Sequence, residues 1–113
     1  MKLYGLKNCD TCRKAMKQLD AAGVNYDFLD VRDDGVSKRQ VMDWAKAVGW
    51  EKLLNRASTT WRQLPADEKD NVDHSQAVRL MADHPTLIKR PVVQLGGDVF
   101  IGWKKETQDA LLK

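Results

Sequence analysis

Long apolar runs are absent from this sequence. No stretch of its 113 residues approaches the roughly 20 consecutive apolar residues that a membrane-spanning helix needs. The opening residues Met1, Lys2, Leu3 and Tyr4 also lack the apolar region and cleavage site of a secretory signal peptide. We therefore expect a cytoplasmic protein that neither crosses nor binds a membrane.

A large excess of charge of one sign is missing as well. The chain has 19 lysine and arginine residues against 16 aspartate and glutamate residues, a formal net charge of +3, and no block of like charge. Nucleic-acid-binding proteins usually carry a basic stripe or face, so we expect no nucleic-acid partner. A small anionic substrate is compatible with this small positive net charge.

Internal repeats, low-complexity tracts and linker-like segments are also lacking. With 42% hydrophobic and 31% charged residues, the composition is that of an ordinary globular protein. A chain of 113 residues is long enough for one hydrophobic core and too short for two. We expect a single domain over residues 1–113, and a monomer.

Cysteine is scarce, since the chain has only Cys9 and Cys12, in a C-x-x-C arrangement. Two cysteines cannot form the disulfide framework of a small secreted protein, and their spacing is typical of redox chemistry in a reducing compartment. The two histidines, His74 and His84, are too far apart for a compact Cys₂His₂ zinc site, whose histidines are separated by about three to five residues. We expect no metal site.

Hydrophobic periodicity predicts a strand, a helix and a second strand near the N-terminus. Residues 3–6 form a short apolar run, residues 11–22 repeat apolar side chains at helical spacing, and residues 25–31 alternate as in a strand. Gly23 is expected to end the helix. A right-handed crossover would make the two strands parallel neighbours.

The middle of the chain, residues 37–84, is mainly helical in pattern. Ser37 is a suitable N-cap for a helix that stops at Gly49, and either Asp73 or Ser75 can cap a later helix that ends before Pro85. Short helical segments are expected at 50–54, 60–64 and 65–69.

The last third returns to strands. Residues 92–95 and 99–101 are predicted to form a hairpin around a Gly-Gly-Asp turn, followed by a helix over 106–112 that buries Ala110 and Leu111. The order of elements predicts an α/β fold with a thioredoxin-like mixed sheet (βαβ…ββα). Residues 1–36 and 85–113 would form its core, and residues 37–84 a helical insertion after the second strand.

Cys9 lies between the first strand and the first helix. Unpaired N–H groups and the positive end of the helix dipole favour a negative charge there and lower a cysteine pKa. We therefore predict that Cys9 is a nucleophilic thiolate. Cys12, one turn later, has two open interpretations: it resolves a mixed disulfide by attacking Cys9, or it only packs on the inner face of the helix.

Pro91 precedes the predicted strand 92–95. In a thioredoxin-like sheet that end of the strand would lie beside the Cys9 loop, and a cis bond would direct the backbone of Arg90 and Pro91 toward the cysteine. The alternative is that Pro91 only begins an edge strand. Among the aromatic residues, we expect Trp44, Trp50 and Trp61 in the core of the insertion and Trp103 beside the active-site pocket.

Three segments carry a resemblance to a known family. They are LYGLKNCDT at 3–11, LLNR at 53–56 with TTWR at 59–62, and PTLIKRPV at 85–92. In this order and spacing the chain resembles the ArsC/Spx family of thioredoxin-fold proteins, close to its YffB-like branch, over essentially its whole length.

The resemblance implies roles for individual residues. Cys9 matches the nucleophilic cysteine, and Arg56 and Arg90 match two of the three arginines that surround the thiolate and its oxyanion substrate in arsenate reductases. Where the third arginine is expected the chain has Gly102 and Trp103, and the nearby Lys104 offers a point charge rather than a planar fork of donors. The candidate substrate-binding residues are Arg56, Arg90, Pro91, Lys7, Asn8 and Thr11, each of which could alternatively be an ordinary surface or structural residue.

The YffB-like branch implies a glutathione-dependent thiol reductase with no bound cofactor. Glutathione would serve as co-substrate, and glutaredoxin or thioredoxin would be possible electron donors. Three alternatives stay open: a glutaredoxin-coupled arsenate reductase, a Spx-like redox regulator that binds RNA polymerase, and an inert interaction domain with unused cysteines.

Overall fold

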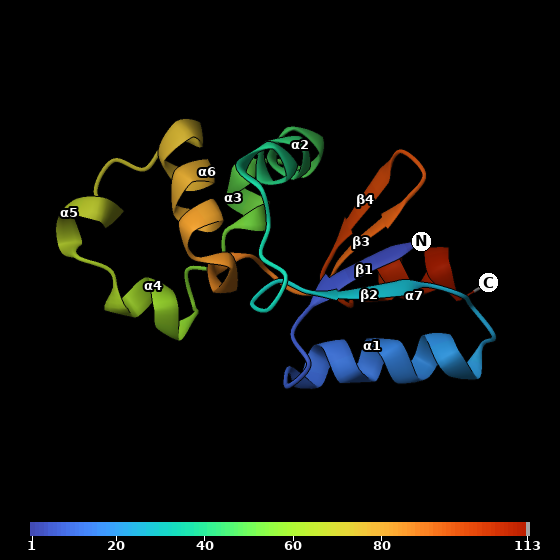
Figure 1. Ribbon diagram of the computed structural model, residues 1–113. Helices are drawn as coiled ribbons and strands as arrows, with labels where there is room; N and C mark the ends of the chain where they lie inside the picture. The colour runs from blue at the N-terminus through green and yellow to red at the C-terminus, as the bar shows by residue number, and fades with distance from the viewer. Residues whose placement is uncertain (113) are drawn as a thin grey trace. The chain divides into compact units, whose positions relative to one another are not determined.

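The computed structural model describes residues 1–112 and divides into two compact units (Figure 1). Unit 1 comprises Met1–Asp34 together with the chain from Arg90 onward, and unit 2 comprises Gly35–Lys89. No helix within residues 1–112 has the length and apolar character needed to span a bilayer.

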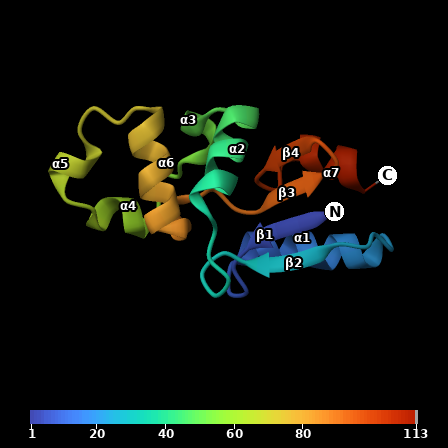
Figure 2. The ribbon, with the colours of Figure 1, turned by 45° about the horizontal axis from the view of Figure 1, so that its top comes forward.

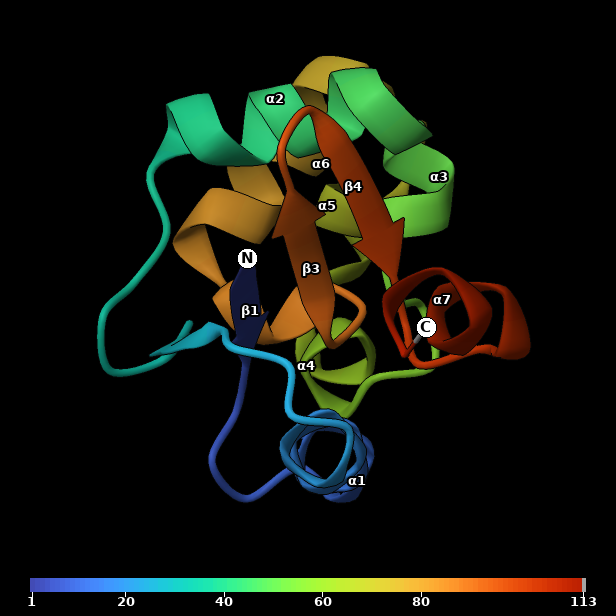
Figure 3. The same cartoon turned by 90° about the vertical axis from the view of Figure 1, so that its right-hand side faces the viewer.

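Unit 1 is built on a four-stranded mixed sheet with two helices. Its elements are β1 (Lys2–Gly5), α1 (Asp10–Ala21), β2 (Asp27–Asp30), β3 (Val92–Leu95), β4 (Asp98–Ile101) and α7 (Lys105–Leu111). The strand order is β2-β1-β3-β4, with β1 parallel to β2 and antiparallel to β3. Figure 3, which looks along α1, shows β3 and β4 as antiparallel arrows. The predicted thioredoxin-like α/β fold is confirmed.

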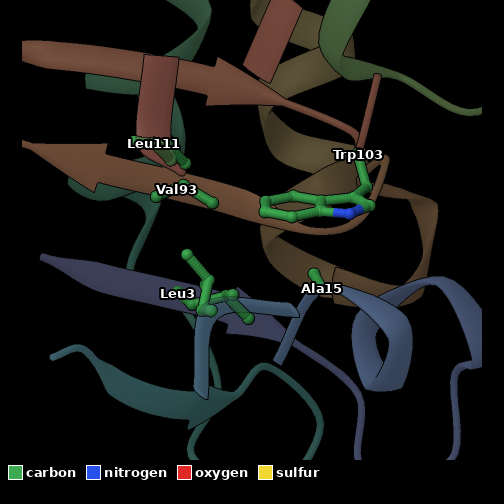
Figure 4. Close-up of a cluster of buried hydrophobic side chains, with 6 residues drawn as sticks. Leu3, Ala15, Val93, Trp103 and Leu111 are labelled. Carbon is green, nitrogen blue, oxygen red and sulfur yellow. The ribbon is translucent and has the colours of Figure 1, made fainter. Parts of the chain in front are cut away.

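The core of unit 1 lies between the sheet and its two helices. Leu3 of β1 pairs with Val93 of β3, and both side chains are fully buried on one face of the sheet. Ala15 of α1 and Leu111 of α7 cover that face, as Figure 4 shows. Burial of apolar surface by both helices holds β1, and with it the following loop, in a fixed place.

One expectation about side chains in unit 1 was wrong. In α7, Leu111 is buried as predicted, but Ala110 is exposed and Thr107 is buried in its place. The ring of Trp103, expected beside the active-site pocket, belongs to the hydrophobic core, and its Nε1 donates a hydrogen bond to Gln18 Oε1 at 2.7 Å. A buried indole needs a partner for its N–H, and Gln18 on α1 provides it.

The named elements of unit 2 are all helices, connected by turns and by one isolated bridge between Leu54 and Ile88. Its elements are α2 (Lys38–Val48), α3 (Trp50–Leu53), α4 (Thr59–Gln63), α5 (Ala66–Lys69), α6 (His74–Asp83) and the 3₁₀ helix η1 (Pro85–Leu87). Figures 1 and 2 both place α6 between the α2–α3 pair and the α4–α5 segment. The predicted cap Ser37 accepts from the Gln40 N–H, and of the two alternatives for α6 it is Asp73 that forms the cap.

The tryptophans of unit 2 differ from the expectation. Trp44 of α2 is fully buried, as predicted, but Trp50 and Trp61 are only half-buried. Both of these rings lie instead beside the side chain of Arg56. An aromatic residue in a helical segment is therefore not sufficient evidence for a core position.

Candidate functional site

Cys9 is the residue that immediately precedes α1. It has extended backbone angles (φ −94°, ψ 123°), its carbonyl accepts from the Arg13 N–H at 2.9 Å, and its own N–H donates to the Leu6 carbonyl at 3.2 Å. The loop after β1 thus turns back tightly and places the cysteine at the helix N-terminus. Its side chain is half-buried, so the sulfur is sheltered without being sealed from solvent.

The surroundings of Cys9 favour its ionised form. Burial alone would raise the pKa of Cys9, but the backbone N–H of Cys12, the thiol of Cys12 and the Arg90 guanidinium outweigh it, so that the pKa is lowered. Cys9 forms no capping hydrogen bond with α1, so we attribute the effect of the Cys12 N–H to its dipole at the helix N-terminus. The lowered pKa of Cys9 agrees with the direction expected for a cysteine at the start of a helix.

Cys12 lies in a contrasting environment. Its side chain is fully buried on the inner face of α1, and burial raises the pKa of Cys12 to about 12. It rests directly against β1, because a Cβ built at Gly5 would come within 2.5 Å of the Cys12 sulfur. Glycine at position 5 is what allows this helix and strand to approach so closely.

Arg90 and Pro91 belong to the same unit as Cys9. The peptide bond between them is cis, which confirms the prediction. Pro91 is buried, and its carbonyl accepts from the Gly102 N–H at 2.8 Å, which anchors this segment to the end of β4. Arg90 is half-buried and acts on Cys9 through both a hydrogen-bond donor and its positive charge. The structure thus brings together Cys9 and one of the two predicted arginines.

Lys7, a predicted substrate contact, has partners that the sequence did not reveal. Its ammonium group pairs with Asp33 at 2.9 Å, its backbone N–H donates to Asp30 Oδ2 at 3.0 Å, and its carbonyl accepts from Arg13 Nε at 2.9 Å. The Asp33 carboxylate raises the pKa of Lys7 by a side-chain hydrogen bond. Arg13 therefore also holds this loop, through the Lys7 carbonyl.

Asp30 at the end of β2 is a residue that sequence reasoning missed. Asp30 is only 6% exposed, and its carboxylate accepts from the backbone N–H groups of Lys7, Arg32 and Asp33 at 3.0, 2.8 and 3.1 Å. Burial opposes ionisation, but these three donors lower the pKa of Asp30 overall. The one available signal was an acidic residue at the end of an apolar strand, which the parallel pairing Gly5–Asp30 places beside the Cys9 loop.

Asn8 and Thr11 flank Cys9 in sequence and are both exposed. Their proposed contacts with a substrate stay predictions. Lys104, the residue nearest in sequence to the missing third arginine, is exposed and precedes α7. Within residues 1–112 no three histidine, cysteine or acidic side chains come together as a metal site, and His74 and His84 are exposed.

Arg56 lies in unit 2, and its predicted role at the thiolate stays a prediction. Its side chain is exposed, and the guanidinium carbon lies over the rings of Trp50 and Trp61, 5.6 and 6.0 Å from their centroids. Both distances fall within the range of cation–π interactions. The two aromatic neighbours were not foreseen as partners of this arginine.

Comparisons with known proteins agree with the fold and with the motifs. A solved structure described as the YFFB protein superposes with a TM-score of 0.94 at 41% identity, covering 99% of this chain and 98% of that one. An uncharacterized protein of Haemophilus influenzae is 37% identical over 108 residues, which are 96% of this chain and 95% of the relative.

More distant relatives have named activities. An arsenate reductase of Neisseria meningitidis is 24% identical over 99% of this chain and 97% of its own length, and a global transcriptional regulator Spx 2 of Lactococcus lactis is 21% identical over 97% of this chain and 84% of its own. The model of the ArsC family matches residues 4–111. This chain therefore belongs to the ArsC family.

Proposed function

We propose that this protein is a glutathione-dependent thiol–disulfide reductase in which Cys9 is the nucleophile. The observation that carries the proposal is the environment of Cys9, whose pKa is lowered by Cys12 and by Arg90 at the start of a helix. The thiolate is the form of cysteine that attacks disulfides. Membership of the ArsC family, with relatives named as arsenate reductase and as Spx, supports a thiol-based redox role.

The reaction would proceed in two thiol–disulfide exchanges. In the first, the Cys9 thiolate attacks the glutathione sulfur of a mixed disulfide between glutathione and a substrate thiol, so that a Cys9–glutathione disulfide forms and the substrate leaves as a thiolate that takes up a proton. In the second, the thiolate of another glutathione attacks the bound glutathione sulfur, which releases oxidised glutathione and regenerates the Cys9 thiolate. The net change consumes one glutathione for each substrate thiol released.

Cys12 is better suited to support Cys9 than to replace glutathione. A resolving cysteine has to lose its proton, and burial raises the pKa of Cys12 to about 12. As a neutral thiol it stabilises the Cys9 thiolate. Glutathione then supplies the second thiol, while glutaredoxin or thioredoxin would reduce any Cys9–Cys12 disulfide that forms under oxidative conditions.

The test compares the two cysteines. Cys9→Ser is expected to abolish turnover of a glutathione mixed disulfide, whereas Cys12→Ala is expected to keep measurable turnover. Mass spectrometry after exposure to oxidised glutathione should find one glutathione adduct, on Cys9. Wild-type turnover by Cys9→Ser would refute the proposal, and an internal disulfide without any glutathione adduct would show that Cys12 resolves.

Arsenate reduction is the second candidate, because one relative bears that name. Trp103 packs in the core where the family resemblance leads us to expect a third arginine, and this favours a site with fewer oxyanion donors. Arsenate turnover with glutathione and glutaredoxin, measured beside mixed-disulfide turnover, distinguishes the two activities. Co-purification with RNA polymerase under oxidised and reduced conditions tests the Spx-like alternative.

A further inference from the structure

A side chain makes the last link between the sheet of unit 1 and the loop that leads to Cys9. Gly5 at the end of β1 pairs with Asp30 at the end of β2, and the Gly5 carbonyl accepts from the Val31 N–H at 2.9 Å. Figure 2 shows β1 and β2 as parallel arrows that end at the same side of the sheet. Two residues beyond Gly5, the Lys7 N–H donates to Asp30 Oδ2 at 3.0 Å.

The two oxygens of the Asp30 carboxylate bind different segments. Oδ1 accepts from the N–H groups of Arg32 and Asp33 at 2.8 and 3.1 Å, which shapes the turn after β2. Oδ2 accepts from Lys7, in the loop after β1. Because Asp30 is buried and its donors are main-chain groups, the carboxylate fixes the backbone of Lys7 relative to β2.

Lys7 is also held through its carbonyl, two residues before Cys9. That carbonyl accepts from Arg13 Nε at 2.9 Å, and the Arg13 N–H donates to the Cys9 carbonyl at 2.9 Å. The Cys9 N–H donates in turn to the Leu6 carbonyl at 3.2 Å. Only one residue separates Lys7 from Cys9, so a displacement of Lys7 has to be passed on to the cysteine.

The interactions that stabilise the Cys9 thiolate depend steeply on position. They come from the backbone N–H and the thiol of Cys12 and from the Arg90 guanidinium. The effect of a helix dipole falls off within the first turn, and hydrogen bonds weaken with distance and angle. A loop that loses an anchor should therefore hold Cys9 less often in the place where its ionised form is favoured.

We infer that Asp30 is a positioning residue for the reaction of Cys9: by accepting from the Lys7 N–H, its carboxylate keeps the sulfur at the start of α1. The inference rests on the proposed function, because it gives Asp30 a part in the nucleophilic attack by Cys9. Asp30 is itself an anion, and an anion disfavours a second negative charge nearby. Loss of positioning and loss of charge therefore predict opposite effects on Cys9 when the carboxylate is removed.

Asp30→Asn separates these two effects. The amide oxygen can still accept from Arg32 and Asp33, but the amide NH₂ then faces the Lys7 N–H, and two donors cannot bond to each other. We expect the pKa of Cys9 to rise, so that alkylation by iodoacetamide at neutral pH slows about three- to tenfold, as for weakening one hydrogen bond to the thiolate. Loss of the charge alone would instead lower this pKa and speed up alkylation.

The measurement is the rate of alkylation of Cys9 as a function of pH, in the full-length reduced protein, with the label located by mass spectrometry. Asp34→Asn is the matched control for charge. It removes an exposed carboxylate next to the same turn, but its amide oxygen can still accept from the Asp30 N–H. The alkylation profile of Asp34→Asn should not move toward higher pH.

Arg13→Lys tests the same positioning from the other side of Lys7. It keeps the positive charge and removes the Nε donor that holds the Lys7 carbonyl, so alkylation of Cys9 should slow about two- to threefold. Arg13 is exposed, and this variant is expected to fold even if Asp30→Asn does not.

Two results would overturn the inference. One is a folded Asp30→Asn variant whose alkylation profile stays in place or moves toward lower pH. The other, should Asp30→Asn not fold, is an unchanged profile in Arg13→Lys. In either case a glutathione adduct on Cys9 of the wild type would leave the proposed function intact. A wild-type Cys9 that alkylates like a free thiol and forms no adduct would refute the proposed function itself.

Discussion

The two units each present an arginine, and they hold its charge by different means. In unit 1, Arg90 is half-buried beside Cys9 and immediately precedes Pro91, to which it is joined by a cis peptide bond. In unit 2, Arg56 is exposed and lies over two indole rings. A charge placed beside a sulfur tunes the chemistry of that sulfur, whereas a charge placed on exposed aromatic surfaces stays in contact with solvent.

The comparison extends to the surroundings of each arginine. Unit 1 fixes its reactive loop with buried groups, namely the Asp30 carboxylate and the close contact between Gly5 and Cys12. Unit 2 fixes its turn with backbone and side-chain hydrogen bonds at the surface. Substitutions of the buried groups in unit 1 should therefore be costly to reactivity and stability, and substitutions of the exposed groups in unit 2 should cost less.

The largest effect is expected for Arg90→Gln. Removing the guanidinium raises the pKa of Cys9, because a donor and a positive charge that favour the thiolate are both lost. A charge-assisted hydrogen bond accounts for about 1.5–3 kcal/mol, so alkylation of Cys9 at neutral pH should slow by about ten- to a hundredfold. The measurement is the rate of iodoacetamide alkylation as a function of pH, in a Cys12→Ala background.

The controls for Arg90 also sharpen the comparison between the units. Arg32→Gln removes an exposed charge from unit 1 and should leave the alkylation profile of Cys9 in place. Arg56→Gln, measured in the same way, tests the role at the thiolate that the family resemblance implies. An unchanged profile in Arg90→Gln would contradict the assignment of Arg90 as the charge that tunes Cys9.

Gly5→Ala tests the close approach of β1 and α1. The new methyl group would meet the Cys12 sulfur at 2.5 Å, and both groups are in the core, so the strand or the helix has to move. We expect a loss of about 1–3 kcal/mol in the free energy of unfolding, measured by urea denaturation. Because the clash is with the sulfur, adding Cys12→Ala should recover much of this loss, and equal stability of the single and double variants would refute the explanation.

Asp30→Asn tests the buried carboxylate that holds the Cys9 loop. An amide cannot accept from all three N–H donors, so the folded state should lose about 1–3 kcal/mol at neutral pH. The pKa of Asp30 is lowered from 3.8 in the folded protein, so its contribution to stability is complete above that value and disappears as the pH falls through the lower, folded-state pKa.

Denaturation curves at several pH values test whether the contribution of Asp30 to stability disappears at low pH. The difference in stability between wild type and Asp30→Asn should be constant above about pH 5 and should shrink in more acidic solution. Asp33→Asn, which removes only the exposed pair with Lys7, is the matched control and should change stability little. A difference that grows toward low pH would contradict the assignment of Asp30 as an ionised buried acceptor.

The sequence predicted those features that depend on local pattern. Apolar alternation and helical spacing located β1, α1, β2 and the β3–β4 hairpin to within a few residues, because one buried face imposes its period on the chain. Ser37 and Asp73 were recognised as possible caps, since a side-chain oxygen before a helix has a specific local partner.

Features that depend on long-range packing were not predictable in this way. Lys7 pairs with Asp33, 26 residues away, only because β1 and β2 are parallel neighbours that end together. Trp103 matched the position of a pocket residue, but Gln18 of α1 provides its N–H with a buried partner. On α7 it is Thr107 and not Ala110 that is buried, because composition alone does not fix which face of a short helix packs inward.

The smallest effect on stability is expected for the two N-cap residues of unit 2, Ser58 and Asp73. Ser58 accepts from the Trp61 N–H at 3.1 Å, and Asp73 accepts from the Gln76 N–H at 2.9 Å. Ser58→Ala and Asp73→Ala should each reduce the free energy of unfolding by about 1 kcal/mol, since each removes one N-cap.

Urea denaturation of each variant measures the two losses. Ser58→Thr and Asp73→Asn keep a side-chain oxygen at the cap position and should retain most of the stability. Because Ser58 also donates to the Asn55 carbonyl, Ser58→Ala removes a second hydrogen bond and should cost at least as much as Asp73→Ala. A variant as stable as the wild type would contradict the assignment of its residue as a cap.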